Sequence, residues 1–170
     1  TESDQLIVRD NEWGTPEEDA LRRDFTINGL FYDPSTKTVI DYVGGYPDLQ
    51  KKVLRTIGQP HLRFKQDPVR MIRLLKFQAR LKFEIDQEAK IALAECHLEI
   101  IKSSQARIFE EILRMLESGS SEFFIHLMHE KGFLFHLLPS LAAFLETADG
   151  LQIYHYLKEV DKRIEKHPFE

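Results

Sequence analysis

Hydrophobic residues recur at helical spacing from about residue 60 onward. The segment that starts at Asp67 and Pro68, a common helix-start pair, shows this well, because one face collects Met71, Leu74, Leu75, Gln78 and Leu81. The spacing predicts a helix there and further helices at about residues 86–98, 104–118, 121–131, 140–146 and 151–166. The predicted breaks coincide with Gly119, Gly132, Pro139 and Gly150.

The pattern before residue 60 is mixed. Thr15, Pro16 and Glu18 form an N-cap, a first-turn proline and a capping box, which predict a helix from about residue 16 to 30. Two strand-like runs, residues 30–32 and 38–41, flank an Asp-Pro turn and predict a hairpin.

A glycine pair then interrupts the chain. After Gly44 and Gly45, we expect a helical turn over residues 47–51 and one more strand in the run VLRTI. The mixed part gives way to the helical part near residues 58–66. The pattern predicts an α+β fold that is predominantly helical.

The composition excludes several classes of protein. Among the 170 residues, 42% are hydrophobic and 30% are charged, which is typical of a folded globular protein. No apolar run approaches the length of a membrane span, and the first residues, TESDQLIVRD, do not resemble a signal peptide. The single cysteine, Cys96, excludes an internal disulfide and a thiolate-rich zinc site, and it fits a cytoplasmic protein.

Positive charge is concentrated in one segment of an acidic chain. The formal net charge is -5, yet residues 51–82 contain ten basic residues against one acidic residue, a net charge of +9. Such a basic segment is typical of a site for phosphate, although a solvated helix face has the same pattern. Both interpretations stay open on charge alone.

The segment RRDFTIN, residues 22–28, places polar residues inside the first predicted helix. Asp24 and Asn28 are then expected on one face of that helix, and a second face collects Arg22, Thr26 and Gly29. Asn and Arg side chains suit hydroxyl and phosphate oxygens. An Arg-Asp network that ties the helix to the hairpin explains the same residues equally well.

Two further segments carry candidate chemistry. In DYVGGYPDL, residues 41–49, Asp41 and Asp48 lie near glycine amides and suit a metal or ribose site, or ordinary turn formation. In QDPVRMIR, residues 66–73, Asp67 and Arg70 share the edge of a first helical turn. An acceptor beside a donor fork can match a base edge, whereas the simpler interpretation is an N-cap and a surface charge.

Other catalytic machinery is not indicated. His126 and His129 are three residues apart but have no nearby third and fourth metal ligand, so we expect no metal site in the chain. We find no nucleophile elbow and no glycine-rich phosphate loop.

Taken together, four segments resemble the blocks of the class II nucleotidyltransferases, which include the tRNA CCA-adding enzymes and bacterial poly(A) polymerases. These segments are RRDFTINGL, DYVGGYPDL, QDPVRMIRLLKF and SSQARIFEEILRML, in the family's order. The resemblance implies three parts: the C-terminal part of a catalytic head (1–58), a helical neck with the base-reading helix (59–139), and the start of a helical body (140–170).

The resemblance also implies roles for individual residues. Nucleotide binding falls to Arg23, Asp24, Asn28, Asp67, Arg70 and Arg73, with Asp67 and Arg70 on the base edge. Support of the joint between head and neck falls to Asp41, Gly44 and Gly45. Arg107 and Glu111 are expected to brace the neck helices as a buried ion pair. The basic segment becomes a candidate path for triphosphate and RNA backbone.

Two departures from the family pattern qualify the expected activity. Gln66 stands where the family has Glu, and the family's first block, whose two aspartates hold magnesium, has no counterpart in residues 1–13. We therefore expect an internal piece of a longer enzyme, in which Mg²⁺ ligands lie outside this chain and two-metal chemistry is not performed by the piece itself.

The expected activity of the whole enzyme is transfer of AMP from ATP to an RNA 3′ hydroxyl. Phe31-Tyr32 and the run YLKEVDKRIEKH resemble the poly(A) polymerase branch. The partners implied are an RNA 3′ end and a nucleoside triphosphate, with no membrane. The alternatives are a tRNA CCA-adding enzyme and a non-catalytic helical RNA-binding or scaffold protein.

Overall fold

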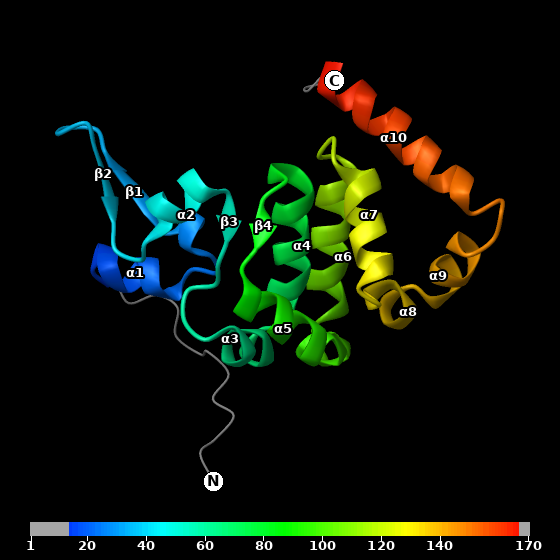
Figure 1. The fold of residues 1–170 in the computed structure, drawn as a ribbon, viewed down its shortest axis with the longest axis horizontal. Helices are drawn as coiled ribbons and strands as arrows, with labels where there is room; N and C mark the ends of the chain where they lie inside the picture. The colour runs from blue at the N-terminus through cyan, green and yellow to red at the C-terminus, as the bar shows by residue number, and fades with distance from the viewer. Residues whose placement is uncertain (1–13, 167–170) are drawn as a thin grey trace, which may run out of the picture.

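The computed structural model describes residues 14–166. Its elements follow one another across an elongated molecule, from the hairpin side to the last helices (Figure 1). The first part comprises α1 (Pro16–Arg22), η1 (Thr26–Asn28), β1 (Leu30–Asp33), β2 (Thr38–Asp41), α2 (Gly45–Lys51) and β3 (Val53–Leu54). The central part comprises α3 (Pro60–Gln66), α4 (Val69–Leu81), β4 (Glu84–Ile85), α5 (Gln87–Cys96), η2 (His97–Lys102) and α6 (Gln105–Leu116). The last part comprises α7 (Ser121–Glu130), α8 (Phe133–Leu137), α9 (Pro139–Leu145) and α10 (Leu151–Lys166).

The predicted helix over residues 16–30 is wrong beyond Arg22. Its capping box is present, but the chain then extends so that Phe25 forms an antiparallel bridge with Thr56. The amide of Ile57 donates to the carbonyl of Asp24 at 3.0 Å, and Phe25 is fully buried. Pairing with a distant segment and burial of a large ring outweigh the local helical preference. The two helical faces expected for residues 22–29 therefore do not exist.

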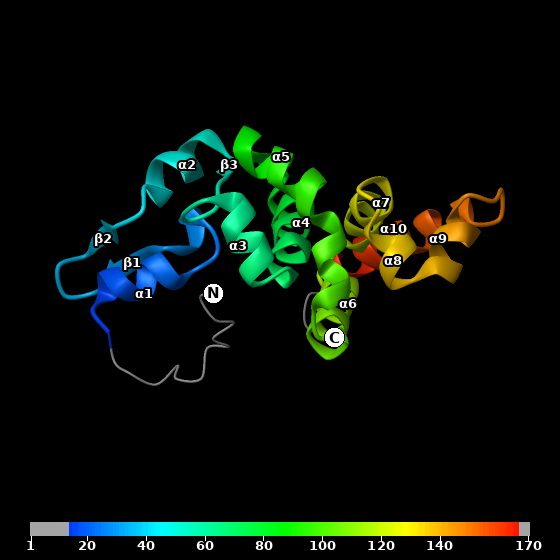
Figure 2. The ribbon, with the colours of Figure 1, turned by 90° about the horizontal axis from the view of Figure 1, so that it is seen from below.

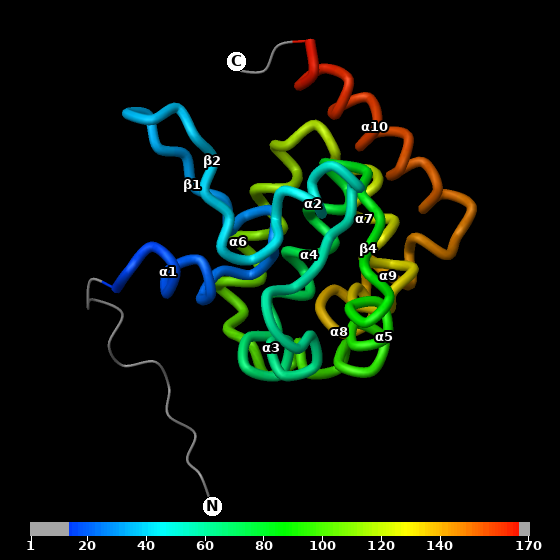
Figure 3. Tube along the Cα trace, turned by 60° about the vertical axis from the view of Figure 1, so that its left-hand side comes forward, coloured from blue at the N-terminus to red at the C-terminus, as the bar shows by residue number. Residues whose placement is uncertain are grey.

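The sheets are small. The predicted hairpin is confirmed, because β1 pairs antiparallel with β2 in the register Leu30 to Asp41. Figure 3 shows this hairpin extending away from the helices. β3 pairs in parallel with β4, Val53 opposite Glu84, which ties the first part of the chain to the end of α4.

Helix α4 is the centre of the fold and packs against α6 and α7 (Figure 2). Met71, Leu74 and Leu75 are fully buried, as the spacing predicts, but Leu81 is exposed because α4 ends there. Asp67 is not its N-cap. It lies at the end of α3, and its carbonyl, not its carboxylate, accepts the amide of Arg70 at 3.1 Å.

One hydrophobic core runs through the described part of the chain. It begins at Phe25 and Leu54 and continues through α4 to Leu145 in α9. Phe25 meets Phe77 edge to face, with ring centroids 5.5 Å apart. The first part and the helices are thus held together by shared apolar burial.

The last helix is attached through a buried carboxylate. Asp161 of α10 accepts the amides of Ser121 and Glu122, each at 2.9 Å, and the Ser121 hydroxyl at 2.7 Å. Since Ser120, the residue before α7, supplies no side-chain cap, Asp161 satisfies the free amides at the start of that helix. Within residues 14–166, no helix combines the length and hydropathy needed to span a bilayer.

Candidate nucleotide-binding junction

A charged junction joins the segment after α1 to helix α4. The bridge at Phe25 fixes the neighbouring Asp24, whose carboxylate is nearly buried. Arg73 Nη2 lies 2.7 Å from Asp24 Oδ2, and Arg70 Nη1 lies 3.3 Å from Oδ1. One carboxylate therefore binds two guanidinium groups whose residues are three positions apart, on the same face of α4.

The Asp67 carboxylate faces the same junction, where it contacts arginines of both α6 and α4. Arg107 Nη2 of α6 donates to Asp67 Oδ2 at 2.9 Å, while Arg70 Nε lies 3.7 Å from the same oxygen. The hydrogen bond to Asp67 raises the pKa of Arg107, burial opposes it, and the nearby carboxylates add to the increase.

The predicted buried ion pair between Arg107 and Glu111 is wrong. Arg107 is 54% exposed and points to Asp67. Glu111 is 14% exposed and pairs with Lys76, with Arg73 at 3.8 Å. Among the described residues no ion pair links Arg107 to Glu111. Asp67 at the end of α3 binds Arg107 instead, and Lys76 of α4 binds Glu111.

Arg63 of α3 clamps the backbone just before Asp24. Its Nη2 atom donates to the carbonyl oxygens of Arg22, at 3.0 Å, and Arg23, at 2.5 Å. Burial and the charge of Arg70 lower the pKa of Arg63. Neither this contact nor the pairing of Lys76 was assigned from sequence, since each joins positions more than 30 residues apart and leaves no local pattern.

Several polar atoms at this junction are buried without a hydrogen-bond partner. They are Arg63 Nε, Asp67 Oδ1, Arg70 Nε and Arg73 Nε. A buried donor or acceptor left unpaired costs about 1–3 kcal/mol. The junction therefore contains one acceptor and several donors that the fold itself leaves unpaired.

Arg23 and Asn28 form a separate group. The Arg23 guanidinium donates to Asp19, with a shortest distance of 2.7 Å, and to the carbonyl of Asn28 at 2.7 Å, and it lies over the ring of Phe31. Among the described hydrogen bonds and ion pairs, none joins the side chain of Arg23 or Asn28 to Asp24. The structure thus brings together the side chains of Asp24, Asp67, Arg70 and Arg73. Arg23 meets this group only through its backbone, because its carbonyl oxygen accepts from Arg70 Nη1 at 3.5 Å.

The Asp41 turn uses its carboxylate for its own backbone. Asp41 Oδ1 accepts the amides of Val43 and Gly45, and Oδ2 accepts that of Tyr46 at 2.9 Å. Partial burial raises the pKa of Asp41, but these backbone donors outweigh burial and hold it below the usual 3.8. Gly44 has φ of +77°, so the geometry is that of a turn.

The second carboxylate of that segment is also occupied. Asp48 accepts the Thr26 hydroxyl at 2.7 Å and pairs with Arg55, which also pairs with Asp86 at 2.7 Å. Within residues 14–166, no three His, Cys, Asp or Glu side chains are grouped to hold a metal ion, which includes His126 and His129. Both carboxylates of this segment are thus engaged by the protein's own groups, which is the turn interpretation of the pattern.

The basic segment divides into two sets of side chains. Five cations contact the protein's own carboxylates or carbonyls: Arg55, Arg63, Arg70, Arg73 and Lys76. The other five are exposed, and their side chains make no hydrogen bond or ion pair among the described residues: Lys51, Lys52, Lys65, Arg80 and Lys82. Of these, Lys82 lies over the Phe123 ring, with Nζ 4.0 Å from its centre. The net charge of +9 is thus not a continuous surface, because half of its cations hold the fold together.

Two family profiles match parts of the chain. Residues 2–55 match the family profile described as "Poly A polymerase head domain", and residues 82–145 match "Probable RNA and SrmB- binding site of polymerase A". The chain is 39% identical to poly(A) polymerase I of Salmonella typhimurium over 163 residues, which cover 94% of this chain and 35% of that protein. The chain therefore spans about a third of the length of the curated relatives it matches.

Enzymes that act on tRNA are also similar. The CCA-adding enzyme of Enterococcus faecalis is 44% identical over 99 residues, 58% of this chain and 24% of that enzyme. A crystal structure of a tRNA nucleotidyltransferase with a primer tRNA and an incoming ATP analog superposes with a TM-score of 0.70 at 28% identity, over 80% of this chain and 42% of that chain. With its mostly helical fold and its two matched domains, the chain belongs to the class II nucleotidyltransferase family of poly(A) polymerases and CCA-adding enzymes.

Proposed function

We propose that the full-length protein is a template-independent RNA 3′-end nucleotidyltransferase of the poly(A) polymerase type, which adds AMP from ATP in the cytoplasm. The part described here supplies nucleotide binding and selection, and residues 82–145 contact the RNA. The similarity to poly(A) polymerase I over nearly the whole chain supports this choice.

The observation that carries the proposal is the set of unpaired polar atoms at the junction. Asp67 Oδ1 is a buried acceptor, and Arg70 Nε, one turn along the chain, is a buried donor. The base edge of adenine offers an amino donor beside a ring-nitrogen acceptor, the complement of that pair. Arg107 keeps the other Asp67 oxygen occupied, so that Oδ1 is left for the base.

The residues described here do not fit the magnesium ions of the family reaction. Asp24 and Asp67 each pair with arginine, and no metal-binding group exists within residues 14–166. We assign the Mg²⁺ ligands to protein outside those residues and derive no step through the metal. What these residues do is bind the nucleotide, orient its base and reject a base with the opposite pattern of donors.

Replacing Arg70 in the full-length protein tests base selection. Arg70→Ala is expected to lower the preference for ATP over CTP, measured as kcat/KM on the same RNA primer, by about tenfold or more, because a two-bond base contact contributes about 1–3 kcal/mol. Arg70 is 15% exposed and contacts Asp24, so its loss is also expected to lower stability, and melting curves must accompany the kinetics. Arg80→Ala, on the exposed side of α4, is the matched control. An unchanged ATP to CTP ratio would reject the assignment.

The CCA-adding alternative is favoured by the similarity to the Enterococcus faecalis enzyme. A tRNA that lacks its 3′ end, supplied with ATP and CTP, separates the two activities. Efficient CMP incorporation by the full-length protein would overturn the polymerase assignment. No incorporation of either nucleotide would favour the non-catalytic RNA-binding alternative.

A further inference from the structure

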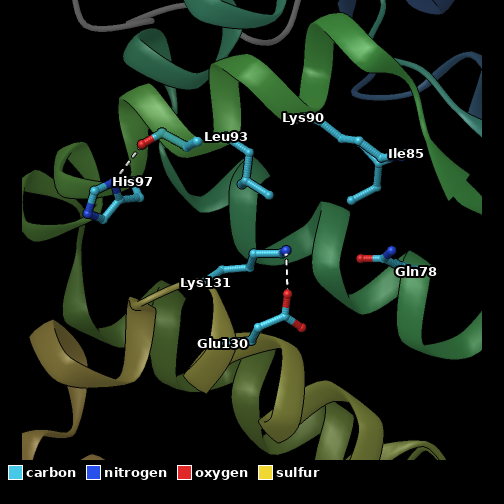
Figure 4. Close-up of a pocket in the computed structure, with 8 residues that line it drawn as sticks. Gln78, Ile85, Lys90, Leu93, His97, Glu130 and Lys131 are labelled. Atoms are coloured by element: carbon cyan, nitrogen blue, oxygen red, sulfur yellow. Dashed lines mark hydrogen bonds and ion pairs between the residues drawn. The ribbon is translucent and has the colours of Figure 1, made fainter.

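A cavity of about 410 Å³ opens between α4, β4, α5, η2 and α7 (Figure 4). Its volume lies within the range of small-ligand sites. None of the junction residues lines it. The lining residues are Gln78, Ile85, Lys90, Leu93, Ala94, His97, Glu130 and Lys131.

The inner wall combines apolar surface with one unpaired amide. Ile85 and Leu93 are almost fully buried and form the apolar part of the wall. Gln78 Oε1 is buried and has no hydrogen-bond partner, and Figure 4 shows its carboxamide directed into the space between Leu93 and Lys131. A ligand that donates a hydrogen bond there completes an acceptor that the fold leaves unpaired.

The mouth carries cations that anions can reach. Lys90 is 47% exposed, with Glu84 at 3.4 Å, and Lys131 is 40% exposed, with Glu130 at 2.7 Å. Exposed ion pairs of this kind contribute little, so a phosphate can compete with the carboxylate for either ammonium group. The hydrogen bond from Lys131 lowers the pKa of Glu130, which keeps that carboxylate ionised beside the lysine.

We propose that this cavity binds the adenine base of an adenosine phosphate, and that an adenosine of the RNA strand supplies it. A glutamine carboxamide pairs with adenine through two hydrogen bonds, the apolar wall covers the ring, and the lysines reach the phosphate. The choice of adenosine rests on the proposed function, because a poly(A) polymerase extends RNA that ends in adenosines. The cavity then holds an adenosine upstream of the 3′ end, apart from the incoming ATP.

Equilibrium binding to the full-length protein tests the proposal in the absence of ATP. Fluorescence anisotropy with labelled oligoadenylate and oligouridylate, followed by competition with AMP, measures each affinity. Gln78→Leu is expected to weaken oligoadenylate binding about tenfold and to reduce the preference over oligouridylate. Gln152→Leu, at an exposed position on α10, is the matched control and is expected to bind as the wild type.

A second variant leaves Gln78 and the apolar wall unchanged. Lys131→Ala is expected to weaken oligoadenylate binding and to reduce its salt dependence by about one phosphate contact. Wild-type affinity of both variants for oligoadenylate would overturn the proposal. If the variants bind AMP more weakly but oligoadenylate as the wild type does, the cavity binds a free nucleotide and not an adenosine of RNA. The anisotropy experiment measures binding and not catalysis. Failure to incorporate AMP in the kinetic assay would therefore reject the proposed function without deciding whether the cavity binds adenosine.

Discussion

Asp24 and Arg73 join the two parts of the molecule, with Asp24 Oδ2 only 2.7 Å from Arg73 Nη2. Asp24 sits in the extended segment after α1, whereas Arg73 lies within α4. Arg70 contacts the second oxygen of the same carboxylate at 3.3 Å. The junction thus depends on one acidic group that contacts two adjacent guanidinium groups.

Replacing this acid is expected to destabilise the fold. Asp24→Asn removes the charge and leaves Arg70 and Arg73 facing each other, which is expected to lower the free energy of unfolding by about 1–3 kcal/mol. Urea denaturation of the full-length protein measures the change. Asp19→Asn, whose carboxylate is 45% exposed, is the control, and an equal effect of both variants would show that the Asp24 pairs contribute no more than surface pairs do.

The two glycines of the turn are expected to respond differently to alanine. A Cβ on Gly45 would lie 2.1 Å from the carbonyl oxygen of Thr26, whereas a Cβ on Gly44 meets no atom within 4 Å. Gly45→Ala is therefore expected to cost about 3 kcal/mol or more through overpacking. Gly44→Ala, strained only by φ of +77°, is expected to cost about 1 kcal/mol. Thermal melts compare the two, and equal losses would contradict this account of the turn.

Local signals in the sequence predicted those elements that a short segment determines by itself. The capping box is present, with the Thr15 amide donating to Glu18 Oε2 at 2.7 Å, and the hairpin and most helices of the second half are confirmed. The short helices α3 and α8 and the strand β4 were not predicted separately. Each has seven residues or fewer and too short a hydrophobic pattern to be distinguished from its neighbours.

Long-range contacts account for the remaining differences. The extended backbone at Phe25 depends on Thr56, and the partner of Arg107 is Asp67 at the end of α3 instead of Glu111 in its own helix. Spacing along one helix cannot rank such partners, because the competing groups lie on other elements. The predicted nucleotide-binding residues were likewise divided by tertiary structure, with Asn28 apart from Asp67.

The Asp41 turn is expected to make stability depend on pH. Its backbone hydrogen bonds hold the pKa of Asp41 in the folded protein below the usual 3.8, so the stabilisation is complete above that value and is lost as pH falls through the folded pKa. Asp41→Asn removes this term. The difference in free energy of unfolding between wild type and variant is therefore expected to be largest near neutral pH and to shrink below about pH 4. A difference that stays constant down to pH 2 would assign the effect to packing alone.

The cap that α10 provides for α7 is expected to be cooperative. Asp161→Ala removes the acceptor of two amides and one hydroxyl at Ser121 and Glu122, and loss of a helix cap costs up to about 2 kcal/mol. Glu159→Ala, an exposed neighbour on the same helix, is expected to change stability by less than about 0.5 kcal/mol. Since Ser121 and Asp161 share a hydrogen bond, a double-mutant cycle with Ser121→Ala is expected to show a non-additive loss in urea denaturation. Additive losses would mean that the hydroxyl contributes nothing through Asp161, and that the cap acts through the two backbone amides alone.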